Sequence, residues 1–109
     1  MASKAEIRKR ATKGAILLDS ENPNWCKKIN LEDLNLANVE YCVLGQLYGY
    51  YSDGQDILFG YDKAKTATRY GFYTEARYGT YSDRVYGVLQ EQWVEEIGKR
   101  CDNVSAKDN

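Results

Sequence analysis

The chain has 109 residues, of which 28% are charged, and its formal net charge is -1. This length fits a single domain with one hydrophobic core that needs no disulfide or structural metal, and the balanced charge excludes a global field that would attract nucleic acid or an anionic membrane. Apolar runs such as AILL at 15–18 are far shorter than the roughly 20 residues of a membrane span, and no charged-then-apolar leader is found, so we expect a cytoplasmic protein without a membrane segment.

The N-terminal segment predicts an amphipathic helix over residues 4–19. SKAE at 3–6 has the form of a capping box, in which Ser3 and Glu6 satisfy each other's free backbone donors. An apolar stripe follows at helical spacing: Ile7, Ala11, Gly14, Ala15 and Leu18. Basic residues lie on the other side: Lys9, Arg10 and Lys13. Pro23 ends the helix because it cannot continue the hydrogen-bond ladder, and Trp25 is expected to plug the corner that follows.

Residues 29–38, INLEDLNLAN, are too few for periodicity to separate a strand from a helical turn, and we expect a turn followed by extended chain. Asn38 is then a candidate N-cap for a helix that reaches Tyr51. One broad face of this helix carries large, core-forming side chains: Tyr41, Val43, Leu44, Leu47, Tyr48 and Tyr51. The small residues Cys42, Gly45 and Gly49 share the opposite side, which predicts a close-packing groove for another helix or, alternatively, for a ligand.

Asp53 can cap a brief helix that ends at Gly60. Residues 61–81 have no sustained helical period and are rich in Thr, Tyr and Gly, which favours a short β-hairpin or an ordered loop near 66–81. Ser82 is the candidate N-cap of a last helix. Its apolar face consists of Val85, Tyr86, Leu89, Trp93, Ile97 and Cys101.

These elements predict a mainly α fold, a small single-domain bundle of three to four helices over residues 1–101. The polar residues 102–109 are expected to form a disordered tail.

Three cysteines, Cys26, Cys42 and Cys101, are an odd number and lie far apart in the sequence. This pattern favours free thiols in a reducing compartment. The chain contains no histidine and no C-x-x-C pair, so we expect no structural zinc and no other cofactor.

The absence of histidine also removes the commonest general base and every Ser-His or Cys-His pairing. No nucleotide-binding or hydrolase motif is present. The adjacent carboxylates Glu32–Asp33 and Glu95–Glu96 are expected on solvated faces. The sequence therefore predicts a protein that is not an enzyme.

All ten tyrosines lie between Tyr41 and Tyr86. The helix faces do not account for those in residues 61–81, and aromatic rings interleaved with cations are typical of recognition surfaces. The candidate partner-binding residues are Tyr61, Tyr70, Tyr73, Arg77, Tyr78 and Tyr81, with Tyr73 and Tyr78 as the expected energetic anchors. We expect a protein partner. Internal packing of these rings is one alternative.

A nucleic acid or a nucleotide is the alternative partner. It would be held by the same rings together with Arg69, Arg77 and the basic stripe Lys9, Arg10 and Lys13.

Several blocks of sequence form a further pattern: RATKGAILLD at 10–19, Trp25, INLEDLNL at 29–36, CVLGQLYGYY at 42–51 and YGFY at 70–73. This pattern covers about half of the chain and resembles a small uncharacterised protein family of actinobacteria and their bacteriophages. The resemblance implies a cytoplasmic protein, phage-borne in some cases, that binds a host or viral macromolecule. It carries no activity and no binding residues.

Overall fold

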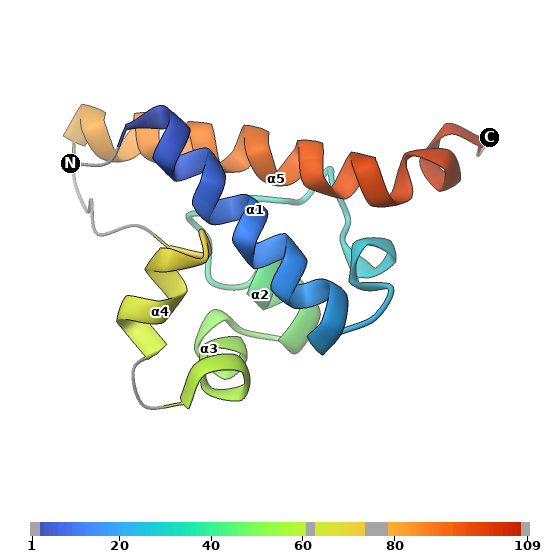
Figure 1. Ribbon diagram of the computed structural model, residues 1–109, viewed down its shortest axis with the longest axis horizontal. Helices are drawn as coiled ribbons and strands as arrows, with labels where there is room; N and C mark the ends of the chain where they lie inside the picture. Colours follow the sequence, from blue (N-terminus) through green and yellow to red (C-terminus); the bar gives the residue numbers. More distant parts are fainter. Residues whose placement is uncertain (1–2, 61–62, 74–78, 108–109) are drawn as a thin grey trace.

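The computed structural model describes residues 3–60, 63–73 and 79–107. These residues form five α-helices and one 3-10 helix: α1 (Lys4–Glu21), η1 (Trp25–Lys28), α2 (Val43–Tyr48), α3 (Tyr51–Phe59), α4 (Lys63–Arg69) and α5 (Gly79–Lys107). The long helix α5 spans the molecule, α1 crosses it, and α2, α3 and α4 lie below (Figure 1). The prediction of a mainly helical domain is confirmed, and the described ranges contain no strand. None of the helices in these ranges has both the length and the apolar character required to cross a membrane.

The core lies where α1 crosses α5. Every residue of the predicted apolar stripe of α1 is buried, and α5 contributes Val85, Leu89, Trp93 and Ile97. A side chain at Gly14 would collide with the backbone oxygen of Tyr70 and with the ring of Trp93. A side chain at Gly71, whose φ is 76°, would likewise collide with the backbone of Ala11. The indole Nε1 of Trp93 donates a hydrogen bond of 2.8 Å to the carbonyl of Gly71, so the Tyr70–Gly71 backbone is held between the two long helices.

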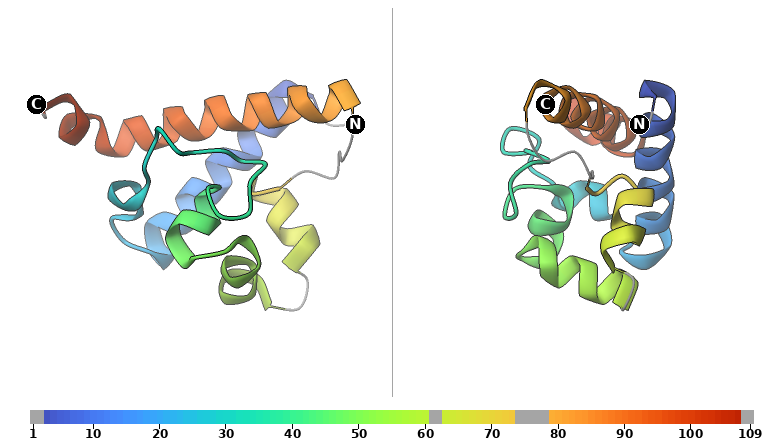
Figure 2. Two further views of the ribbon diagram at one scale, coloured as in Figure 1. Left: turned by 180° about the vertical axis from the view of Figure 1, so that it is seen from behind. Right: turned by 90° about the vertical axis from the view of Figure 1, so that its left-hand side faces the viewer.

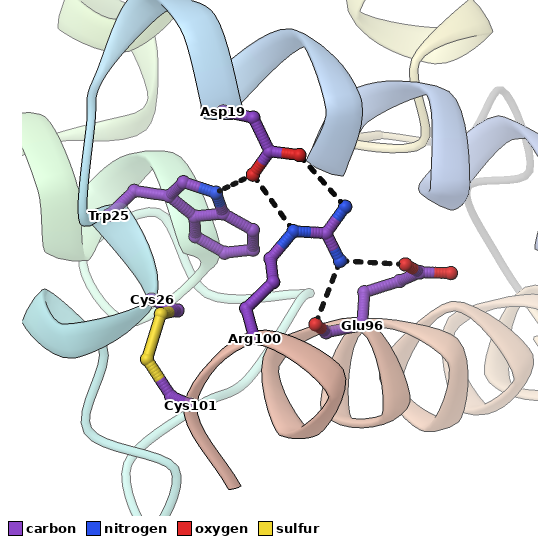
Figure 3. The surroundings of a disulfide bond; sticks show 6 residues. All are labelled: Asp19, Trp25, Cys26, Glu96, Arg100 and Cys101. Atoms are coloured by element: carbon purple, nitrogen blue, oxygen red, sulfur yellow. Dashed lines mark hydrogen bonds and ion pairs between the residues drawn. A yellow bond between two sulfur atoms is a disulfide. The ribbon is translucent and has the colours of Figure 1, made fainter. Parts of the chain in front are cut away.

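Arg100, on α5, connects the last turn of α1 with η1 and α5 (Figure 3). Its guanidinium donates to both carboxylate oxygens of Asp19, at 2.8 and 3.0 Å, and to Glu96 at 2.9 Å. Asp19 also accepts a 2.9 Å hydrogen bond from the indole of Trp25, which is buried as the sequence predicted. Bidentate pairing of this kind combines charge with fixed geometry, so it fixes α1 against α5. The bond from Trp25 attaches η1 to the same carboxylate.

Glu96 is only 2% exposed, so the prediction that the pair Glu95–Glu96 lies on a solvated face is wrong for Glu96. Its burial is compensated because Thr12 donates at 2.7 Å and Gln92 at 2.8 Å, in addition to Arg100. Buried carboxylates are tolerated when they are paired and hydrogen-bonded in this way.

Cys26 and Cys101 form a disulfide between η1 and α5 (Figure 3). The prediction of three reduced thiols is therefore wrong for this pair, while Cys42 is a free, buried thiol. The two bonded cysteines are 75 residues apart, and sequence spacing does not show that the corner after α1 returns to the last helix. The argument for a reducing compartment loses its basis, because disulfides are rare there.

The helix α2 is much shorter than predicted. Asn38 does not cap it. Its side chain instead accepts from the backbone of Glu40 and Tyr41 in the preceding turn. Cys42 is the N-cap, and its Sγ accepts from the N–H of Gly45 at 3.3 Å.

The predicted groove of Cys42, Gly45 and Gly49 is not a helix–helix contact. Gly45 lies against the backbone of Val39 and Glu40, so the close approach is made by the chain's own preceding turn. Gly49 ends α2 at φ 97°, a left-handed conformation that favours glycine, and no neighbour approaches it.

Other boundaries also differ from the predictions. Helix α3 ends at Gly60 as expected, but Asp53 lies inside its first turn and Tyr50 is the N-cap. The prediction of a hairpin or ordered loop near 66–81 is wrong at both ends of that range. Helix α4 extends to Arg69, and α5 begins at Gly79, before the predicted N-cap Ser82. Residues 74–78 lie outside the described ranges. Helix α5 continues to Lys107 through the predicted tail, where no glycine or proline interrupts it.

Candidate partner-binding surface

The outward side of α1 and the end of α4 form two adjoining surface hollows. One, of about 300 Å³, is lined by Glu6, Lys9, Arg10, Lys13 and Arg69. The other, of about 360 Å³, is lined by Lys13, Ile16, Leu17, Ser20 and Tyr70. Lys13 belongs to both, so they form one continuous region, which we call the α1–α4 surface. The structure thus brings together five residues that the sequence suggested for anion binding or stacking: Lys9, Arg10, Lys13, Arg69 and Tyr70.

The helical repeat explains this grouping. Residues three or four apart share one side of a helix, so Lys9, Lys13 and Ile16 project from α1 together. Arg69 and Tyr70 join them because the Tyr70–Gly71 backbone packs directly on Gly14 and Ala11, as described above. The absence of side chains at Gly14 and Gly71 therefore sets the distance between α4 and α1.

The α1–α4 surface is strongly basic at one end and apolar at the other. Four cations surround the first hollow, and its one carboxylate, Glu6, pairs with Arg10 at 3.5 Å. In the second hollow Ile16 is 58% exposed and lies beside Leu17 and the ring of Tyr70. Such a combination suits a ligand that presents both acidic and apolar groups.

Tyr70 forms a wall of the second hollow rather than a free platform. Its ring packs against Phe59, with 5.6 Å between centroids. The ammonium of Lys13 lies 5.1 Å from the centroid of the same ring, a cation–π contact. With its ring in contact with a cation and with another ring, Tyr70 is poorly placed to stack on a nucleic-acid base.

Tyr73 lies in a different environment. It is half-buried and packs against Tyr51 at 5.8 Å between ring centroids. Both rings line a small hollow of about 60 Å³ together with Cys42 and Phe72. Burial, with smaller contributions from neighbouring groups, raises the pKa of Tyr51 well above its usual value. Tyr73 therefore belongs to an internal cluster of rings.

The structure does not bring Tyr70 and Tyr73 onto one recognition surface. Tyr61, Arg77 and Tyr78 lie outside the described residues. Tyr81 belongs to α5, but its side chain is not among those described.

A second surface was missed by sequence reasoning. Residues 30–41, which we call the acidic loop, contain no helix or strand, yet hydrogen bonds hold them in place. The amide of Gln90 accepts from Leu36 N–H at 3.2 Å and donates to the carbonyl of Leu34 at 2.7 Å. Gln46 makes the equivalent pair of bonds with the backbone of Asn30.

The acidic loop exposes three carboxylates and three large apolar side chains: Glu32, Asp33, Glu40, Leu31, Val39 and Tyr41. Two sequence signals could have revealed it. Asn30, Asn35 and Asn38 each accept a hydrogen bond from the backbone two residues on, the Asx turn that asparagine favours. Residues 29–60 also contain five carboxylates and no lysine or arginine.

Comparisons of the chain with protein-family models, with curated proteins and with solved structures found no match.

Proposed function

We propose that this protein is a non-enzymatic interaction protein that binds a protein partner through the α1–α4 surface. The observation that carries the proposal is the exposed Ile16 in a hollow that adjoins four cations. The proposal moves the main contact away from residues 61–81. Among those whose side chains the structure describes, Arg69 and Tyr70 line this surface.

The two ends of the surface have different energetic roles. Covering the exposed part of Ile16 contributes on the order of 1–2 kcal/mol, because a fully buried aliphatic side chain contributes roughly 1.5–3 kcal/mol. The cations accelerate encounter with an acidic partner and exclude basic ones, but they add less to affinity since they remain hydrated. A partner segment with acidic side chains beside apolar ones fits both ends.

Binding of nucleic acid or a nucleotide is the second candidate function. The four cations around one hollow favour it, whereas the cation already lying on the ring of Tyr70 disfavours stacking of a base. Salt separates the two functions. Four phosphate contacts to a single strand would make log K fall with log salt at a slope of about -3, while a contact centred on Ile16 would depend weakly on salt.

The cytoplasmic location expected from the sequence also remains a proposal. The resemblance to an actinobacterial and phage family supports the cytoplasm. The Cys26–Cys101 disulfide weighs against a reducing compartment.

The test is site-specific photo-crosslinking from Ile16. A photoreactive amino acid replaces Ile16, and in a control variant it replaces Val94, an exposed aliphatic residue on α5. We expect a protein adduct from position 16, formed in lysate with or without nuclease, and none of that size from position 94. Equal adducts from both positions would contradict the proposed surface, and an adduct lost after nuclease treatment would favour the nucleic-acid function.

A further inference from the structure

We propose that the partner of the α1–α4 surface is the acidic loop of a second copy of this chain, so that the protein associates head to tail. This inference rests on the proposed function, since it assumes that the α1–α4 surface is a binding surface. It names the partner of that surface from the chemistry of the chain itself.

Charge is segregated along the chain and across the fold. Helices α1 and α4 together contain eight Lys or Arg residues and three carboxylates. The acidic loop contains three carboxylates and no lysine or arginine. The net charge of -1 conceals two regions of opposite sign. Regions of opposite sign steer association and fix orientation.

The exposed apolar side chains follow the same division. Among the described residues, seven large hydrophobic side chains are exposed, and three of them lie in the acidic loop: Leu31, Val39 and Tyr41. Ile16 is the exposed apolar residue of the α1–α4 surface. Each region therefore offers apolar contact area beside its charges, as an interface centre and its polar rim require.

The two regions lie on opposite faces of the molecule. Helix α1 is in front in Figure 1, and the acidic loop is in front when the molecule is turned by 180° (Figure 2, left). In the edge view, α1 and α4 lie on one side and the acidic loop and α2 on the other (Figure 2, right).

One copy therefore cannot bring its two surfaces together. Contact between them needs a second copy, and it joins different surfaces on the two chains. Such a heterologous contact builds a ring or an open chain rather than a closed two-fold dimer.

Size and rigidity also suit an interface. The principal extents are 40 × 29 × 21 Å, so each broad face can accommodate the roughly 800 Å² that a standard interface buries per partner. The acidic loop is already held by the side-chain amides of Gln46, Gln90 and Asn38. A surface ordered before binding loses less conformational entropy when it binds.

The experiment uses two charge-reversed variants of the full chain. Lys9→Glu with Lys13→Glu reverses the α1–α4 surface, and Glu32→Lys with Glu40→Lys reverses the acidic loop. Matched controls reverse exposed charges elsewhere: Lys27→Glu with Lys28→Glu, and Glu91→Lys with Glu95→Lys. Sedimentation velocity measures the mass of each protein over a range of concentrations, in about 0.05 M and about 0.5 M NaCl.

We expect the wild type and both controls to exceed the 12.5 kDa chain mass with rising concentration at both salt concentrations, and to need a moderately higher concentration for the same mass in high salt. Each reversed variant alone should remain monomeric. An equimolar mixture of the two should give a 1:1 complex, because each supplies the surface that the other lacks. This rescue also shows that both variants are folded.

A wild type that is monomeric throughout, a reversed variant that associates like the wild type, or a mixture without complex would each overturn the inference. The proposed function is judged separately by the photoreactive residue at Ile16. If position 16 crosslinks to a different protein and the wild type sediments as a monomer, the proposed function is retained and self-association is rejected. No adduct at position 16, in lysate or in the purified protein, rejects both.

Discussion

A single methyl group should have opposite effects at two helix glycines, Gly14 and Gly98. Replacing a helix-interior glycine by alanine normally stabilises a helix by up to about 1 kcal/mol. At Gly98 no atom lies within 4 Å of the added carbon, so Gly98→Ala should gain about 0.5–1 kcal/mol.

At Gly14 the added carbon would overlap the backbone oxygen of Tyr70 and lie 2.9 Å from a ring carbon of Trp93. Neither neighbour can move freely, because the indole of Trp93 donates a hydrogen bond to the carbonyl of Gly71. The whole of α1 must shift. Overpacking of this kind costs about 1–3 kcal/mol and exceeds the gain in helix propensity. We expect Gly14→Ala to lower the free energy of unfolding by about 1–2 kcal/mol.

Urea denaturation of the two variants and the wild type, followed by circular dichroism, measures the difference. The midpoint should fall for Gly14→Ala and rise for Gly98→Ala, with the slope unchanged. Melting temperatures should separate in the same order, by roughly 4 °C for each kcal/mol. If Gly14→Ala were as stable as the wild type, the close contact between α1 and the Tyr70–Gly71 backbone would be refuted.

Four further results are expected. Cys101→Ser should reduce the free energy of unfolding by about 4 kcal/mol, because it opens a loop of 75 residues. Intact mass spectrometry should show the wild type lighter by two hydrogens than its reduced form, and no such difference in the variant. Gly45→Leu should lower the free energy of unfolding by about 1–3 kcal/mol, since the leucine side chain would meet the backbone of the preceding turn; an unchanged urea midpoint would contradict that contact. Tyr73→Ala should lower the melting temperature, because its ring packs on Tyr51; a variant that binds less but melts normally would restore the surface role. Burial opposes ionisation of Glu96, but hydrogen bonds from Thr12, Arg100 and Gln92 outweigh it and lower its pKa. The ionised carboxylate therefore contributes its full stability above the ordinary pKa of 4.5, and this contribution is lost as pH falls through the lowered pKa. Denaturation of the wild type and of Glu96→Gln across that pH range should show a smaller acid dependence in the variant.

The sequence predicted best where the signal is local and periodic. Ile7, Ala11 and Leu18 mark the buried side of α1 because a helix repeats every 3.6 residues, and a single apolar stripe fixes which side faces the core. Gly60 ended α3 as expected because glycine readily adopts the positive φ found there. The sequence was least accurate at helix ends, where a cap such as Cys42 is not among the usual residues.

The sequence by itself determined the helical class, the core side of α1 and α5 and the separation of charge along the chain, since these depend on residue type and spacing alone. Only the tertiary structure decided that Cys26 meets Cys101, that Glu96 is buried, and that Arg69 and Tyr70 join the basic side of α1. Each of these depends on residues brought together from distant parts of the chain. Such contacts follow from how the helices cross and where the glycines let the backbone approach, and no local pattern records them.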